Sequence, residues 1–109
     1  MTHETDRELL ELAAKAAGIK LGWCSDGRSW LKWPSFQWRP LEDDGDAFRL
    51  AVRLGIKLEL HPAWVYARAV IASQKWREIE EGWGNSGDPY AATRRAIVRA
   101  AAAIGRAMP

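Results

Sequence analysis

The order of apolar and polar positions along the chain predicts three helices. The first covers residues 5–17, where leucines and alanines recur at helical spacing and Gly18 can end the helix in a left-handed conformation. Thr5 and Glu8 have the spacing of a capping box, in which each side chain satisfies a free amide of the first turn. The apolar positions of this helix are Leu9, Leu10, Leu12, Ala13, Ala16 and Ala17.

The second predicted helix begins within the acidic run of residues 42–46 and ends at Gly55. Acidic side chains at a helix start accept hydrogen bonds from free amides and interact favourably with the positive end of the helix dipole. The apolar face of this helix is expected to contain Ala47, Phe48, Leu50, Ala51, Val52 and Leu54.

The third predicted helix opens at Asp88-Pro89, because a capping aspartate followed by proline is typical of a first helical turn. At 100° per residue, its apolar residues gather on one face and three arginines gather on the opposite face. The apolar face contains Tyr90, Ile97, Ala101, Ile104 and Met108, and the basic face contains Arg95, Arg99 and Arg106.

Between the helices the pattern changes to the alternation of strands. A β-hairpin is expected within residues 19–33, with a turn at Ser25-Asp26-Gly27, and Pro34 should end its second strand. Phe36 to Trp38 is expected to form a short strand or an extended segment. Residues 56–60 alternate strictly and predict a half-buried strand closed by His61-Pro62.

Residues 64–83 fit two interpretations. Trp64, Tyr66 and Arg68 alternate with smaller residues, which favours a strand with a hairpin partner at residues 75–81. A helical stripe that includes Ile71 also fits, and Pro62 would be an acceptable helix start. We favour two strands. The predicted fold is therefore one α+β domain over residues 1–109, with three helices packed on a small antiparallel sheet of four or five strands.

Composition changes this picture in one respect, which is tryptophan. The 109 residues include 7 Trp against 2 Phe and 2 Tyr, whereas 48% apolar residues and a formal charge of +2 are ordinary. The apolar content excludes a disordered chain, and the charge is too small for a polybasic tail. The polar, acidic start of the chain predicts no secretory signal, and no apolar run is long enough to cross a membrane, so we expect a cytoplasmic protein.

Residues suited to catalysis or metal binding are scarce. Cys24 is the lone cysteine, so no internal disulfide or multi-cysteine metal site is possible, and we expect it to be a small hydrophobic residue of the hairpin. The motifs of P-loop, serine hydrolase and zinc protease sites do not occur. Asp43, Asp44 and Asp46 could hold a divalent cation, but helix capping explains them without one. We expect no metal and no cofactor.

The tryptophans are better candidates for partner binding. A core of this size cannot easily hold seven indoles, because each buries about 150–250 Å² and has an N–H that needs a partner. Exposed Trp and Arg dominate protein–protein hot spots. The partner-binding residues we predict are Trp30, Trp33, Trp64, Trp83, Arg95, Arg99 and Arg106.

Two segments resemble known sequences. Residues 38–52 (WRPLEDDGDAFRLAV) resemble a motif of small accessory proteins encoded by phages and prophages of proteobacteria, and residues 87–102 (GDPYAATRRAIVRAAA) resemble the C-terminal helix of the same family. With residues 9–18 the resemblance covers about half of the chain. The family has no catalytic assignment, so no site residue is carried over. The resemblance implies an accessory phage gene of the kind that often acts by binding a host protein, and it favours strands over a helix in residues 64–83.

The leading hypothesis is therefore a non-enzymatic phage accessory protein. It would bind a host protein and inhibit a bacterial defence component such as a CRISPR effector, in the cytoplasm of the infected cell. The alternative is a nucleic-acid-binding module that uses Arg94, Arg95, Arg99 and Arg106 together with exposed tryptophans. An enzyme would need a cleft around the acidic cluster and His61.

Overall fold

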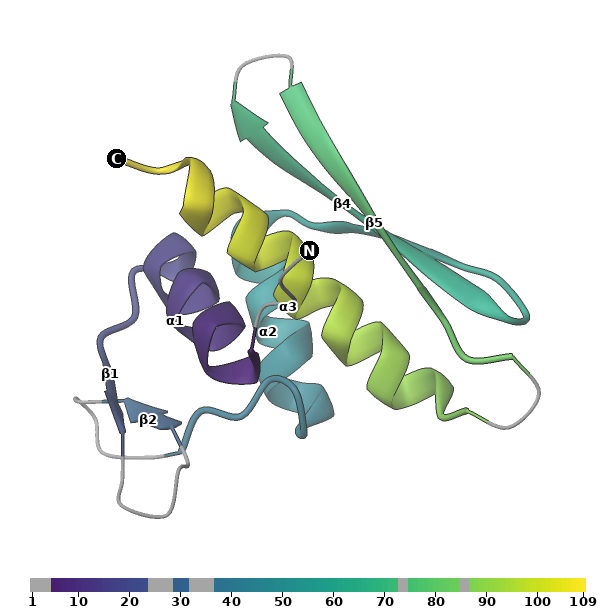
Figure 1. Cartoon of the computed structure of the whole chain (residues 1–109), viewed down its shortest axis with the longest axis horizontal. Coiled ribbons are helices and arrows are strands. Elements are labelled where there is room, and N and C mark those ends of the chain that lie inside the picture. The colour runs from purple at the N-terminus through teal and green to yellow at the C-terminus, as the bar shows by residue number, and fades with distance from the viewer. Residues whose placement is uncertain (1–4, 24–28, 32–36, 73–74, 85–86) are drawn as a thin grey trace.

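The alanine-rich sequence of residues 96–103 allows one helix to lie at the centre of the fold. The computed structural model describes residues 5–23, 29–31, 37–72, 75–84 and 87–109. Helix α3 (Pro89–Ala107) contacts α1 (Asp6–Ala17), α2 (Asp44–Leu54) and the strands β4 (Trp64–Ala72) and β5 (Lys75–Gly82) (Figure 1). Small side chains let these neighbours approach on several sides, so residues 96–98 and 100–103 are all buried. Tyr90 and Met108, expected on the apolar face, are 68% and 40% exposed.

The helix starts follow the predicted capping residues. The Thr5 hydroxyl accepts a hydrogen bond from the Glu8 amide at 3.1 Å, and it donates to Glu8 Oε1 at 3.0 Å. Asp43 caps α2 by accepting from the Asp46 amide at 2.8 Å. Asp88 caps α3 in the same way, through the Tyr90 amide at 2.9 Å. All three predicted helices are confirmed.

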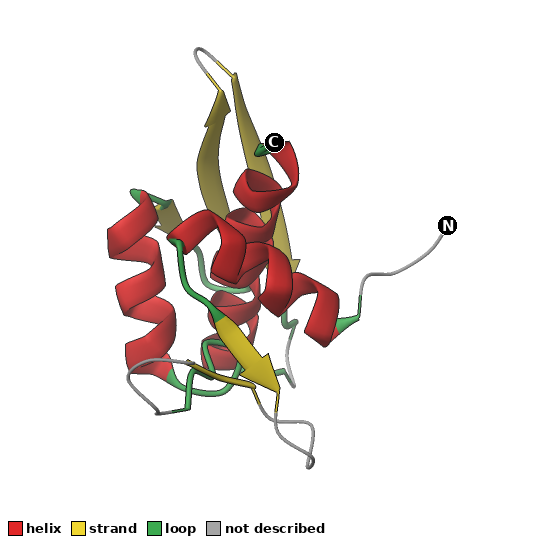
Figure 2. Ribbon diagram, turned by 90° about the vertical axis from the view of Figure 1, so that its left-hand side faces the viewer, coloured by secondary structure: helices red, strands yellow, loops and turns green. Residues whose placement is uncertain are grey.

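Residues 64–83 form two strands, as we favoured, and not a helix. Strands β3 (Lys57–Leu60), β4 (Trp64–Ala72) and β5 (Lys75–Gly82) make an antiparallel sheet in the order β3-β4-β5. Alternate residues of β4 face α3 and are fully buried, namely Val65, Ala67 and Ala69. The helices lie on one side of this sheet (Figure 2). The layered arrangement therefore is α+β.

Among the described residues, the main sheet is smaller than the four or five strands that we predicted. Strands β1 (Leu21–Trp23) and β2 (Ser29–Leu31) pair with each other as the predicted hairpin, but they form a separate two-stranded unit. In the part of the chain that the structure describes, the main sheet therefore has three strands and not four or five. The turn at 25–27, Cys24, Pro34 and Phe36 lie outside the described residues. Trp38 follows them and is buried, with 4% of its surface exposed.

Candidate partner-binding groove

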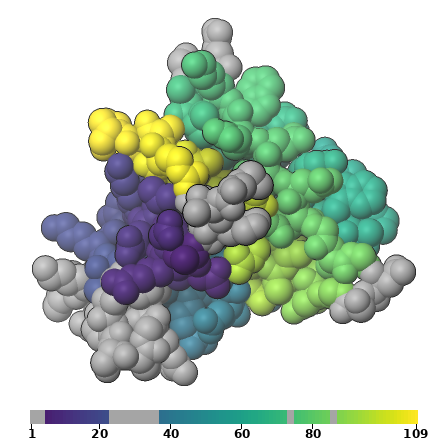
Figure 3. Space-filling view, viewed as in Figure 1, coloured from purple at the N-terminus to yellow at the C-terminus, as the bar shows by residue number. Residues whose placement is uncertain are grey.

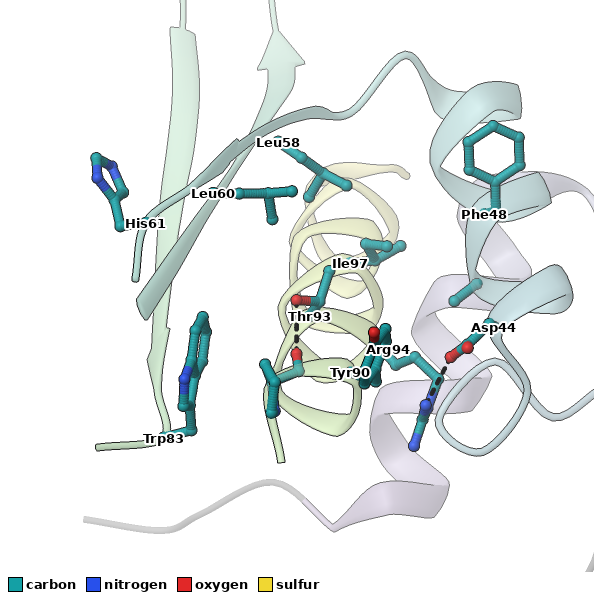
Figure 4. Close-up of a pocket in the computed structure, with 12 residues that line it drawn as sticks. Asp44, Phe48, Leu58, Leu60, His61, Trp83, Tyr90, Thr93, Arg94 and Ile97 are labelled. Atoms are coloured by element: carbon teal, nitrogen blue, oxygen red, sulfur yellow. Dashed lines mark hydrogen bonds and ion pairs between the residues drawn. The ribbon is translucent and has the colours of Figure 1, made fainter. Parts of the chain in front are cut away.

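An apolar groove of about 480 Å³ lies between α2, α3 and β3, with Trp83 at one end (Figure 4). Its floor is formed by residues that are almost completely buried, such as Ala47 of α2 (1% exposed) and Ile97 of α3 (4%). Most of the surface that lines it is apolar. The large apolar residues of the groove are Phe48, Leu58, Leu60, Trp83, Tyr90 and Ile97.

The groove forms because the chain turns sharply at Gly55, and α2 and β3 then diverge from this turn. Gly55 ends α2 in the left-handed conformation (φ 65°), and the Ile56 amide donates back to the Ala51 carbonyl at 2.9 Å. Glycine adopts this conformation without the steric cost that a side chain would add. The chain then turns into β3, which runs away from α2 above α3 (Figure 4). The space between the two elements is left open.

Three large apolar side chains on the walls of this groove are exposed to solvent. Phe48 is 67% exposed, Leu60 is 68% exposed and Tyr90 is 68% exposed. Val52, one helical turn after Phe48, extends the apolar surface of α2 and is 65% exposed. Contiguous exposed apolar surface beside a groove is typical of an interaction site.

Sequence reasoning missed these wall residues. The alternation of residues 56–60 predicted a half-buried strand, but Leu60 is more than half exposed because no described element covers it. Phe48 was assigned to the apolar face of α2, and yet α2 buries only Ala47, Leu50 and Ala51. One signal was present in the sequence, because six apolar positions in an eleven-residue helix form a wider face than one neighbour can cover.

Polar groups in the groove are held by bonds within the protein. Arg94 donates to Asp44 Oδ1 at 2.6 Å and, through Nε, to the Leu41 carbonyl at 2.9 Å. Thr93 Oγ1 donates to the Pro89 carbonyl at 2.7 Å (Figure 4). These bonds fix the polar side chains in place, so the groove offers a preformed and mainly apolar surface.

His61 follows β3 and lines the groove together with Asp44, and its ring also belongs to an aromatic cluster with Trp64 and Tyr66. Its ring stacks on Trp64 with centroids 4.8 Å apart and meets the edge of Tyr66 at 5.6 Å. Its Nε2 lies 2.8 Å from Glu59 Oε2, and this hydrogen bond lowers the pKa of Glu59 below its usual 4.5. The charge of Glu80 raises the pKa of Tyr66 above 10.0.

The structure describes the side chains of two of the four tryptophans predicted to bind a partner. Trp83 is half-buried and lines the groove. Trp64 is 37% exposed and stacks on His61. Trp33 and the side chain of Trp30 lie outside the described residues. Trp76, which we did not select, is 57% exposed and lies 5.4 Å from the Arg68 guanidinium.

The predicted basic face of α3 is not a free surface. Arg95 pairs with Asp6 of α1 at 2.9 Å, and Arg99 pairs with Glu81 of β5 at 2.5 Å. The space-filling view shows α3 reaching this face of the molecule between α1 and β5 (Figure 3). The two arginines therefore connect α3 to its neighbours on either side. Arg106 is exposed in the last turn of α3.

The acidic residues at the start of α2 have structural partners. Asp43 caps the helix, and this part of the prediction is confirmed. Asp46 accepts from the Arg39 amide at 2.9 Å and from Arg49 at 2.7 Å. Asp44 pairs with Arg94 in the groove. Among the described residues, no group of three or more His, Cys, Asp or Glu side chains has an arrangement that could hold a metal ion.

Comparison of the chain with models of protein families, with curated proteins and with solved structures gave no match. Within the described residues, no helix is both long enough and apolar enough to cross a membrane.

Proposed function

We propose that this protein is a non-enzymatic binding module that takes apolar side chains of a partner protein into the groove between α2, α3 and β3. The observation that carries the proposal is the exposure of Phe48, Leu60 and Tyr90 around a buried apolar floor. Interface cores are enriched in aromatic residues and depleted of charged ones, and these walls have that composition. The free protein leaves this surface in water, so a partner would gain free energy by covering it.

The fixed geometry of the groove supports tight binding. Arg94 and Thr93 are already held by hydrogen bonds, so they lose little conformational freedom when a partner binds. Trp83 is half-buried in the free protein, and its backbone amide donates to the Ala63 carbonyl at 3.1 Å. Preorganised surfaces bind more tightly because less ordering has to occur on association.

The ion pairs of α3 argue against the nucleic-acid alternative. Phosphate binding would compete with Asp6 for Arg95 and with Glu81 for Arg99. A mobility-shift assay with a labelled single-stranded oligonucleotide tests this point, and we expect no shift at moderate salt. A shift that weakens steeply with added salt and is lost in Arg99→Gln would favour the alternative and contradict our proposal.

The resemblance to phage accessory proteins leads us to propose a host bacterial protein as the partner, met in the cytoplasm of the infected cell. A component of a defence system such as a CRISPR effector is the first target to test. The chain would then be expressed in a host that carries the defence system, and the plating efficiency of a sensitive phage would be measured. We expect an increase with the wild type and none with a groove variant.

Two matched substitutions test the groove itself. Leu60→Asp places a charge in the groove, and Val70→Asp places the same charge on β4, where Val70 is 65% exposed and lies outside the groove. Partners captured from host extract by the wild type would be purified and their affinities measured for both variants. We expect Leu60→Asp to weaken binding by about tenfold or more and Val70→Asp to leave it nearly unchanged. Equal affinity for the wild type and Leu60→Asp, with both variants folded, would overturn the proposal.

A further inference from the structure

The hydrogen-bond pattern of the sheet shows where the backbone of β3 points. The His61 amide donates to the Trp64 carbonyl at 2.9 Å, so this opposite pair is of the hydrogen-bonded type. Such pairs recur at every second residue of an antiparallel ladder. The register of β3 with β4 therefore makes hydrogen-bonded pairs of Glu59 with Tyr66 and of Lys57 with Arg68. The backbone groups of Leu58 and Leu60 point to the other edge of β3.

The other side of β4 gives an independent check of this pattern. The Trp83 amide donates to the Ala63 carbonyl at 3.1 Å, which places odd-numbered residues of β4 in the hydrogen-bonded pairs with β5. Even-numbered residues of β4 must then bond to β3, as the pairs of Tyr66 and Arg68 require. Both results agree.

The outer edge of β3 is open in the part of the chain that the structure describes. β3 is the outermost strand of the sheet, and no described residue forms a backbone hydrogen bond with Leu58 or Leu60 from outside it. Natural sheet edges are usually protected by charged side chains. β5, the opposite edge, has this protection, with charged residues at Lys75, Arg77, Glu78, Glu80 and Glu81. On β3 the charged residues Lys57 and Glu59 lie on the face away from the groove, and the side chains of the two leucines line the groove.

The helix layer extends further than the sheet on this side. α3 lies against β4 and β5, and α2 packs beside α3. No described strand covers the outer surface of α2, and Phe48 and Val52 are 67% and 65% exposed. A fourth strand beside β3 would cover this surface, and its side chains would fill the groove from above. Free backbone groups and uncovered apolar side chains therefore meet at one place.

We propose that the groove binds an extended segment of the partner protein, which adds to the sheet as a fourth strand along the open edge of β3. The proposal rests on the proposed function, because it specifies how the same groove takes its partner. Backbone hydrogen bonds to Leu58 and Leu60 would supply affinity, and alternate side chains in the groove would supply specificity. β3 has four residues, so a segment of about five residues spans it.

Charges beside the groove specify the chemistry of this segment. Lys57 and Glu59 alternate with the leucines and lie on the opposite face of the sheet. Side chains that lie opposite each other on neighbouring strands attract when their charges differ. The segment is therefore apolar at alternate positions, with an acidic residue opposite Lys57 and a basic residue opposite Glu59.

A helical segment of a partner fits less well. A helix in the groove would cover Phe48 but would leave the amides of Leu58 and Leu60 without partners. A second copy could also pair through its own β3, and the exchange experiment below distinguishes that occupant from a partner segment. A single extended strand satisfies both the backbone and the apolar surface.

Amide hydrogen exchange of the full chain tests the proposal residue by residue. The probe is a peptide selected from a displayed library of random sequences on the wild type, with binders of Leu60→Asp removed. In the free protein we expect slow exchange at Lys57 and Glu59 and fast exchange at Leu58 and Leu60. When the peptide binds, exchange at Leu58 and Leu60 should slow by about tenfold or more.

Backbone methylation of the selected peptide gives a second test that leaves the protein unchanged. N-methyl groups at alternate positions should abolish binding, and N-methyl groups at the intervening positions should be tolerated. A peptide that binds in the groove as a helix, without protection of Leu58 and Leu60, overturns the strand proposal and leaves the proposed function intact. If the protein without peptide is a dimer in which the Leu58 and Leu60 amides are already protected, the edge is occupied by a second copy and the strand proposal is overturned. Failure to select any groove-dependent peptide contradicts both proposals.

Discussion

Gly105 of α3 lies directly against the backbone of Leu12 in α1. A Cβ atom on Gly105 would come within 2.0 Å of the Leu12 carbonyl oxygen and within 2.8 Å of its carbonyl carbon. Real Cβ atoms essentially never approach other atoms so closely, and backbone atoms cannot move aside as a flexible side chain can. The contact between α1 and α3 therefore depends on the absence of a side chain at this position.

Gly105→Ala should destabilise the protein even though alanine favours helices. The helical preference alone would stabilise α3 by about 0.5–1 kcal/mol. The added methyl group must push α1 away from α3, and overpacking of this kind costs about 1–3 kcal/mol. We expect a lower free energy of unfolding, measured by denaturant titration followed by circular dichroism.

Gly45→Ala provides the matched control, because Gly45 also lies inside a helix. The atoms nearest to its added Cβ are the ends of the Arg49 and Asp43 side chains, at 3.2 Å. The Arg49 end can rotate away, and Asp43 Oδ2, which caps α2, has to shift by only a few tenths of an ångström, so we expect a smaller change in stability than for Gly105→Ala. If Gly105→Ala were as stable as Gly45→Ala, the close contact with Leu12 would not be present in solution.

The helices and strands could be predicted because their signals are local. Thr5 lies three residues from Glu8, and Asp43 lies three residues from the Asp46 amide that it caps. Such contacts depend only on neighbouring residues, and the sequence displays them directly. The same holds for the hairpin of β4 and β5, because the alternation of Trp64 to Arg68 is visible in the chain itself.

The number of strands in the sheet and the groove could not be predicted, because they depend on contacts between distant segments. Nothing near Leu60 in the sequence indicates that no described strand lies beyond β3 in the sheet. Arg95 pairs with Asp6, 89 residues away, so a face that looked free in the helical pattern is engaged. Periodicity shows which side of an element is apolar, but it does not show whether another element covers that side.

Arg94→Met should cost more stability than the same change at its neighbour Arg95. The Arg94 side chain is 16% exposed and donates to both the Leu41 carbonyl and Asp44, so its loss leaves a partly buried acceptor without a donor. We expect a loss of about 1–3 kcal/mol in the free energy of unfolding. Arg95 and Asp6 are 38% and 61% exposed, and the loss of such a pair costs about 0–1 kcal/mol.

Thermal unfolding of both methionine variants at two salt concentrations would check this difference. The Arg95→Met effect should shrink at high salt, because exposed ion pairs are screened. The Arg94→Met effect should persist, since the bond to Leu41 involves a neutral carbonyl. Equal losses in the two variants would show that Arg94 does not hold the segment before α2 to α3.

Glu59 should titrate below the usual 4.5 of a glutamate carboxyl group. The His61 hydrogen bond favours the ionised form, which lowers the pKa in the folded protein. A lowered folded pKa means that Glu59 contributes stability above about pH 4.5, and that this contribution is lost as the pH falls through the folded pKa. Carboxyl chemical shifts measured by NMR across this range give the midpoint.

His61→Phe isolates the cause of this shift. The phenyl ring can still stack on Trp64, but it cannot donate to Glu59. We expect the Glu59 midpoint to rise toward 4.5 and the stability difference from the wild type to shrink below that pH. A midpoint that does not move in His61→Phe would mean that another group, such as Lys57, lowers the pKa of Glu59.

Alanine substitutions at Ile97 and Phe48 should separate the floor of the groove from its wall. Ile97 is 4% exposed, and Ile97→Ala should cost about 2–5 kcal/mol in unfolding free energy, because it removes a packed side chain and leaves a cavity. Phe48 is 67% exposed, so Phe48→Ala should change stability by no more than about 0.5 kcal/mol. Denaturant titration of both variants measures the two values. A loss at Phe48 as large as that at Ile97 would mean that the aromatic ring is packed in the free protein, and a closed groove could not receive a partner's side chains.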